Sequence, residues 1–225
     1  MNGFIEFIMG PMVWISFLVF FGGLAVKAAG IVRRAREKEA YMFSYLTWFH
    51  SLRSICAWLV PFLPRATRER PLFYGVSYLF HLAVFAVPLF LSAHIVLVEE
   101  AFNISWPALG DGTADLLTVT VIAALVFFGI RRMALPEVRF LTSARDFGLL
   151  SIVLLPFLTG FMAYHQVFSD TWPGAYEWIM ILHILSGELM LIIIPFSRFS
   201  HMITAPLSRA YTGSEFGNVR HARDW

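Results

Sequence analysis

The sequence predicts an all-α integral membrane protein with five transmembrane helices, its N-terminus outside and its C-terminus in the cytoplasm. Its 225 residues are 58% hydrophobic and only 14% charged, whereas about a quarter of the residues of a soluble domain are charged. Five apolar stretches approach the roughly 20 residues with which a helix crosses a hydrocarbon layer of about 30 Å. Lys and Arg residues are confined to alternate loops between these stretches.

We expect one membrane domain, 1–225, whose spans cover approximately residues 8–30, 71–98, 113–132, 147–168 and 178–203. In a helix every backbone polar group is satisfied internally, as lipid requires. The third stretch is short, but long Arg side chains at its end can reach the interface. The N-terminus lacks the positive region of a cleavable signal peptide, so we expect the first span to remain in the mature protein.

The charges predict the orientation. Of the seventeen Lys and Arg residues, nine lie between Lys27 and Arg70, four between Arg131 and Arg145, and four between Arg198 and Arg223. The two remaining loops contain none, and carry acidic residues and the interfacial aromatics Trp106, Trp172, Tyr176 and Trp178. Because Lys and Arg are retained on the cytoplasmic side, the loop between the first two spans and the tail, 204–225, are expected in the cytoplasm.

The segment 44–63 has the pattern of a cytoplasmic amphipathic helix. Its apolar residues recur at helical spacing, opposite a polar face that includes His50. Such a helix lies on the membrane surface or against a partner. The single cysteine, Cys56, excludes an internal disulfide and any iron–sulfur cluster held by this chain alone. Redox centres would therefore need histidine ligands.

Four histidines form the main functional signal: His81 and His94 in the second span, and His183 and His201 at the two ends of the fifth. These spans run in opposite directions. His81 therefore meets the level of His201, and His94 that of His183. Intramembrane ionisable residues are rare and usually functional, so two matched pairs favour axial ligation of two haems over histidines that merely line helix contacts.

Helical geometry supports the pairs unequally. Eighteen residues at about 100° each return to the same helix face roughly 27 Å further on, so His183 and His201 point the same way. Thirteen residues leave His94 about 140° from His81 in an ideal helix. Pro88 can kink the second span and change that rotation. Gly187, one turn from His183, leaves room for a porphyrin.

Other polar residues are candidates for accessory roles. His165 and Tyr164, at the outer end of the fourth span, are candidate quinone contacts or ordinary interfacial residues. Glu188 is the one carboxylate inside a span, and a proton path, a quinone site, a subunit contact and a protonated structural role are all open. Arg198 is a candidate partner of a haem propionate or a positive-inside anchor. His50 and His221 are expected to be solvated.

Two stretches resemble the gamma subunit of respiratory nitrate reductase. HILSGELMLIIIPFSRFSH, from His183 to His201, resembles the last helix of that family, and RRMALPEVRFLTSARD, from Arg131 to Asp146, resembles its loop after the third helix. The long amphipathic insertion and FLTG, at 157–160, are more similar to the membrane cytochromes of heterodisulfide-reductase-like and sulfite-reduction-associated complexes. Two departures from nitrate reductase are the thirteen-residue histidine spacing and the absence of lysine from the outer side.

The resemblance implies two stacked haems b, the inner ligated by His81 and His201 and the outer by His94 and His183. It further implies electron exchange between membrane quinone and a cytoplasmic iron–sulfur subunit, of heterodisulfide-reductase-like or nitrate-reductase-beta-like type, in a prokaryotic inner membrane. The chain would then be an electron-transfer subunit, not a complete enzyme, with no nucleic-acid partner. Two alternatives stay open: a link from an extracytoplasmic multihaem cytochrome c to the iron–sulfur subunit, and a haem-free transporter or scaffold.

Overall fold

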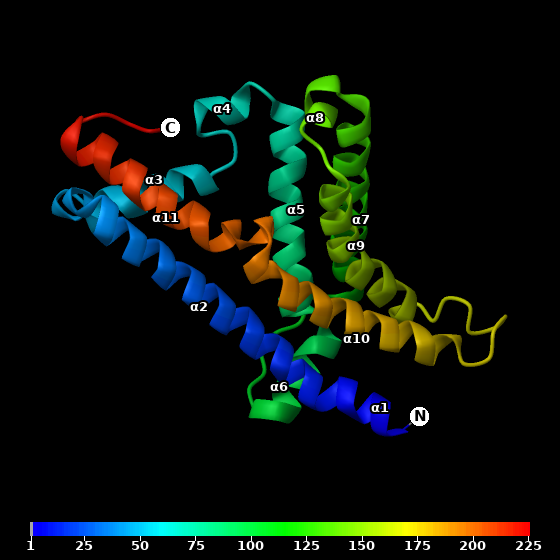
Figure 1. Ribbon diagram of the computed structural model, residues 1–225. Helices are drawn as coiled ribbons and strands as arrows, with labels where there is room; N and C mark the ends of the chain where they lie inside the picture. The colour runs from blue at the N-terminus through cyan, green and yellow to red at the C-terminus, as the bar shows by residue number, and fades with distance from the viewer. Residues whose placement is uncertain (1) are drawn as a thin grey trace. The chain divides into compact units, whose positions relative to one another are not determined.

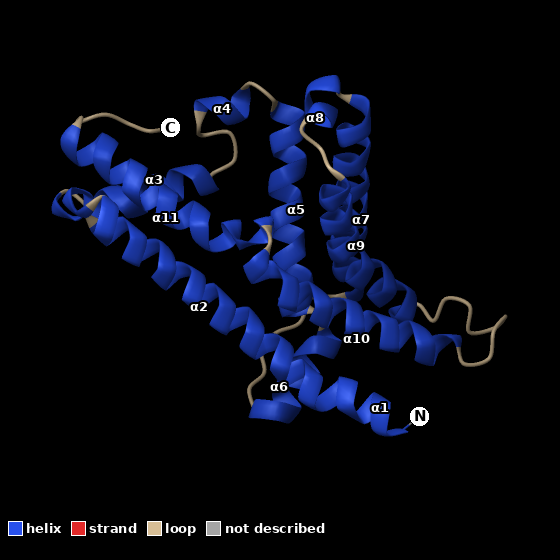
Figure 2. Cartoon of the chain, in the orientation of Figure 1, coloured by secondary structure: helices blue, strands red, loops and turns tan. Residues whose placement is uncertain are grey.

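The computed structural model describes residues 2–225, and every regular element in this part of the chain is a helix (Figures 1 and 2). The α-helices are α1 (Asn2–Phe7), α2 (Val13–Lys38), α3 (Trp48–Leu59), α4 (Arg65–Arg68), α5 (Pro71–Phe90), α6 (Ser92–Phe102), α7 (Asp111–Ala134), α8 (Pro136–Phe140), α9 (Ala144–Tyr164), α10 (Ala175–Ile193) and α11 (His201–Ser214). Short π-helical and 3-10 segments are η1 (Ile8–Met12), η2 (Ala40–Ser44), η3 (Ile194–Phe196), η4 (Arg198–Ser200) and η5 (Glu215–Val219).

Five helical segments within residues 2–225 are long and apolar enough to cross a membrane: Gly3–Lys38, Pro71–Phe90, Asp111–Ala134, Ala144–Tyr164 and Ala175–Phe196. Most of their apolar side chains are not buried by the protein itself; Leu18, for example, is 74% exposed. So much apolar surface suits lipid rather than water. The predicted all-α class with five spans is therefore confirmed, and the protein is a multi-pass membrane protein.

The chain divides into two compact units. One unit comprises Met1–Tyr74 with Leu191–Trp225, and the other comprises Gly75–Met190. Helices α5 and α10 pass from one unit into the other. The division arises because the segment after the first span packs on the C-terminal segment, which is remote in sequence.

In the first unit, α3 lies alongside α11 (Figure 1). Small residues allow the close approach: a Cβ on Gly213 would overlap the side chain of Ser54, and Ser51 Oγ lies 3.0 Å from Ser214 Oγ. Small-residue contacts of this kind let helix backbones come together. The contact buries the polar face of α3 and exposes its apolar face, with Trp48 at 84%.

His50 departs from expectation. We predicted a solvated surface histidine, but the residue is half-buried and its Nδ1 is inaccessible to solvent. A Cβ on Gly217 would overlap the imidazole. The reason is that the polar side of α3 packs against the C-terminal segment instead of water. The amphipathic helix itself spans Trp48–Leu59, shorter than the predicted 44–63.

In the second unit, α7 and α9 pack side by side (Figure 1). A capping box starts α9: Ser143 donates from both its backbone N–H and its Oγ to Asp146 Oδ2, each at 2.8 Å. Helix α9 holds the residues that lie against His183 in the candidate site.

Two predicted spans are interrupted. The second, expected over 71–98, leaves the helical conformation at Leu91 (φ −72°, ψ 129°), and the fifth, expected over 178–203, leaves it at Ser197 (φ −116°, ψ −174°). Both breaks follow a proline, Pro88 and Pro195, which cannot donate a backbone hydrogen bond. Spacing rules for an ideal helix therefore hold neither from His81 to His94 nor from His183 to His201.

Candidate functional site

His94 sits just after the first of these breaks, on α6. Its Nδ1 lies 3.0 Å from Pro88 O, a carbonyl whose regular helical donor is lost at the break. The next two carbonyls are also satisfied, Leu89 O by Trp106 Nε1 and Phe90 O by the Leu109 N–H, both at 2.8 Å. The three carbonyls that lose their helical donors at the break are thus hydrogen-bonded, as membrane depth demands.

His183 lies on α10 and is held by α9. Its Nδ1 is 2.9 Å from Pro156 O. One turn further along α9, Gly160 faces the ring so closely that a Cβ there would lie 2.8 Å from His183 Cε1 and 3.0 Å from Nδ1. A glycine is required where the backbone approaches a ring at this distance. The carbonyl and the glycine together fix the orientation of the imidazole.

The structure brings these two histidines together. The ring centroids of His94 and His183 are 6.0 Å apart, and their planes differ by only 3°. Two imidazoles that bind one metal ion from opposite sides, each through a metal–nitrogen bond of about 2 Å, have centroids about 6 Å apart. The pair therefore fits the axial ligation of a haem iron.

The tautomers agree with this fit. A carbonyl oxygen only accepts, so the bonds to Pro88 O and Pro156 O put the proton of each neutral ring on Nδ1 and leave the lone pair on Nε2. Histidines that bind metals usually donate their second ring N–H to a backbone carbonyl or carboxylate. His81 and His201 share the arrangement, with Nδ1 2.7 Å from Ser77 O and 3.0 Å from Arg198 O.

His81 belongs to the second unit and His201 to the first. Their pairing stays a prediction from the sequence. The same holds for Arg198 as the partner of a propionate, although its carbonyl orients the His201 ring. Around Gly187, no described atom outside its own helix turn lies within 4 Å of the position a Cβ would take.

The two quinone candidates at the end of α9 both meet acidic residues at the start of α7. His165 Nε2 lies 3.0 Å from Asp115 Oδ1, and Tyr164 lies near Asp111. From the sequence, Asp111 and Asp115 are only acidic residues in a stretch without Lys or Arg. The contact between His165 and Asp115 could not be predicted from helical periodicity, because the two residues are about fifty positions apart and lie at the ends of different helices.

Glu188 is 4% exposed, and neither of its carboxyl oxygens has a hydrogen-bond partner. An ionised carboxylate in such a place is costly. The structure thus places Glu188 inside the protein.

Lys27 was counted from the sequence as a loop charge, but it lies within α2 and reaches the second break. Its Nζ is 2.5 Å from Ser200 Oγ and 3.1 Å from Pro195 O. No sequence pattern marks this contact, since it joins residues about 170 positions apart.

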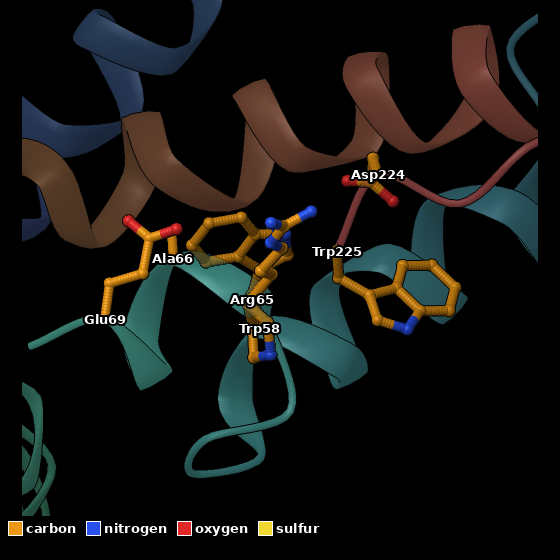
Figure 3. Close-up of a pocket in the computed structure, with 7 residues that line it drawn as sticks. Trp58, Arg65, Ala66, Glu69, Asp224 and Trp225 are labelled. Carbon is orange, nitrogen blue, oxygen red and sulfur yellow. The ribbon is translucent and has the colours of Figure 1, made fainter. Parts of the chain in front are cut away.

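A pocket of about 300 Å³ lies in the first unit, between α4 and the C-terminal end (Figure 3). Its lining residues are Trp58, Pro64, Arg65, Ala66, Glu69, Asp224 and Trp225. No histidine is among them. The candidate site is therefore defined by the paired imidazoles and not by this pocket.

The sequence is similar to that of a protein from Nitratidesulfovibrio vulgaris strain Hildenborough that is named only "Protein". The two are 40% identical over 218 residues, which cover 95% of this chain and 94% of that protein. No model of a known protein family matches the chain. No solved structure matches it.

Proposed function

The chain belongs to one family with this N. vulgaris protein, and we propose that it is the dihaem cytochrome b subunit of a prokaryotic respiratory complex. The proposal is carried by the imidazoles of His94 and His183, whose planes are parallel and whose ring centroids are 6.0 Å apart. The Nδ1 of each ring is hydrogen-bonded to a backbone carbonyl. His94 and His183 would hold the outer haem, and His81 and His201 the inner one. The bound haems would supply two one-electron carriers between the faces of the membrane.

The protein's own residues contribute orientation and exclusion. Pro88 O and Pro156 O orient the two rings, and the bond at each Nδ1 leaves the lone pair of Nε2 available to a metal ion. If histidines held the iron from both sides, no position would be left on it for a substrate, which suits electron transfer.

The proposed reaction partners are a quinone near the outer face and a cytoplasmic iron–sulfur subunit. This chain holds no such cluster, because it has one cysteine. We propose the exposed apolar face of α3, which includes Trp48 and Phe49, as the surface that docks the subunit. The burial of the polar face of α3 against α11 supports this, since it leaves the apolar face as the one available for contact.

Purified protein is expected to contain about two haems b per polypeptide. The pyridine haemochrome assay measures this number, and a quinol analogue added to the oxidised protein should reduce the outer haem first. A folded preparation without haem would instead favour the transporter or scaffold alternative. Two haems that do not respond to quinol would favour electron supply from an extracytoplasmic cytochrome c.

His165 is proposed to take a proton from quinol. Its Nε2–H is held by Asp115 Oδ1 at 3.0 Å, which leaves Nδ1 as the base and lets the carboxylate stabilise the imidazolium. His165→Phe removes the base, so reduction of the outer haem by a quinol analogue should slow by roughly 10²-fold or more in stopped-flow measurements. Haem content should stay unchanged. His221→Phe, in the exposed tail, is the matched control, and native rates in His165→Phe would exclude this role.

A further inference from the structure

The break before His201 leaves a carbonyl without its helical donor. In a continuous helix the Phe199 N–H would donate to Pro195 O. Here it donates to Ser197 Oγ at 3.2 Å instead, because the backbone is extended at Ser197. A carbonyl left unpaired at membrane depth costs free energy. This break therefore needs a donor from elsewhere.

Lys27 supplies that donor. Its Nζ lies 3.1 Å from Pro195 O and 2.5 Å from Ser200 Oγ, and Ser200 Oγ donates in turn to Ser197 O at 2.8 Å. One ammonium thus ties both ends of the segment from Pro195 to Ser200. His201 is the next residue.

Gly23 extends the contact along the same face of α2. It precedes Lys27 by four residues, which places the two on one side of the helix. A Cβ at Gly23 would lie 2.7 Å from Pro195 Cβ and 2.9 Å from Pro195 Cγ. A Cβ at the adjacent Gly22 would have no neighbour within 4 Å. The face of α2 that carries Gly23 and Lys27 therefore packs against Pro195, and the face that carries Gly22 does not.

We propose that Gly23 and Lys27 form a clasp that positions His201 as an axial ligand of the inner haem. Lys27 is a positioning residue: it fixes the segment whose end sets the place of the imidazole, and it does not itself touch the reacting groups. A lysine whose Nζ donates to Pro195 O and Ser200 Oγ is unlike one that only anchors a helix end at the interface. The inference rests on the proposed function.

Lys27→Met tests the clasp, because it keeps the length of the side chain and removes the donors. It should lose, or shift in midpoint potential and electron paramagnetic resonance signal, the haem that His201→Ala removes. The haem that His183→Ala removes should be unaffected. Lys27→Arg should restore the native signal, and Lys38→Met, at the exposed end of α2, should not change it. Native potentials and signals for both haems in Lys27→Met would overturn the clasp.

A second pair of variants avoids any change of charge. Gly23→Ala should perturb the same haem, since its new Cβ collides with Pro195, whereas Gly22→Ala should behave as native. Both gain the same helix propensity. Equal behaviour of the two variants would contradict the clasp. Absence of haem from the native protein would overturn the proposed function, and with it the role of His201; two native haems with unperturbed variants would overturn the clasp alone.

Discussion

Replacing either His94 or His183 with alanine is expected to remove the same haem and leave about one haem b per polypeptide. The ring centroids are 6.0 Å apart and the ring planes are parallel within 3°. In the proposed site one iron would lie between the two imidazoles, so each variant would delete one of its two bonds to histidine. Each imidazole is hydrogen-bonded to its own carbonyl, so the remaining histidine stays in place when the other is replaced. It cannot move across to take over the missing bond to iron. Reduced-minus-oxidised spectra and redox titration would identify the haem that is lost.

The comparison that decides the pairing uses the other two histidines. His81→Ala and His201→Ala should each remove the second haem and leave the first. If His94→Ala and His201→Ala eliminated the same spectral component, the assignment of ligands would be wrong. Loss of both haems in every variant would be uninformative about pairing, so His94→Gln and His183→Gln, which preserve side-chain volume better, should be measured beside the alanine variants.

The number and class of the helices could be predicted because they depend on local composition. About twenty apolar residues suffice to specify a span, wherever the rest of the chain lies. The amphipathic pattern of α3 was equally readable, since Trp48, Phe49 and Leu52 recur at helical spacing. Periodicity does not show which element packs against each face of a helix. For this reason His50 was expected in water, although it packs on α11.

The breaks at Leu91 and Ser197 could be suspected but not located. Pro88 and Pro195 signal a kink, yet prolines also occur inside membrane helices, as Pro156 does in α9. The outcome depends on donors that arrive from remote positions: Trp106 and Leu109 for one break, and Lys27 for the other. Such contacts leave no local signature in the sequence.

Topology alone suggested that His94 and His183 lie at one level, and the rings do lie together in the structure. Their role as ligands remains a prediction. The helical spacing that supported His183 and His201 does not hold, because the fifth span is not continuous at Ser197. The level of each histidine along its span was thus a better guide to pairing than its angular position around the helix. A kink changes the angular position but leaves the level nearly the same.

Gly160→Ala is expected to disrupt the outer haem without touching a ligand. The new Cβ would lie 2.8 Å from His183 Cε1 and 3.0 Å from Nδ1, closer than nonbonded contacts allow. Relief would require movement of the ring, which is held at Nδ1 by Pro156 O and would be held at Nε2 by the iron. Overpacking of this kind costs about 1–3 kcal/mol. The haem that His183→Ala removes should be lost or shifted in potential.

Gly148→Ala is the matched control for this variant. It lies in the same helix, α9, and no described neighbour would come within 4 Å of its Cβ. Each substitution also gains about 1 kcal/mol of helix propensity, so a difference between the two variants reports the contact with His183 and not the helix. Native spectra and potentials in Gly160→Ala would show that the imidazole tolerates displacement. In that case the imidazole of His183 could move away from Gly160, which it could not do if a metal ion held its Nε2. The close approach of α9 to His183 would then be ordinary helix packing.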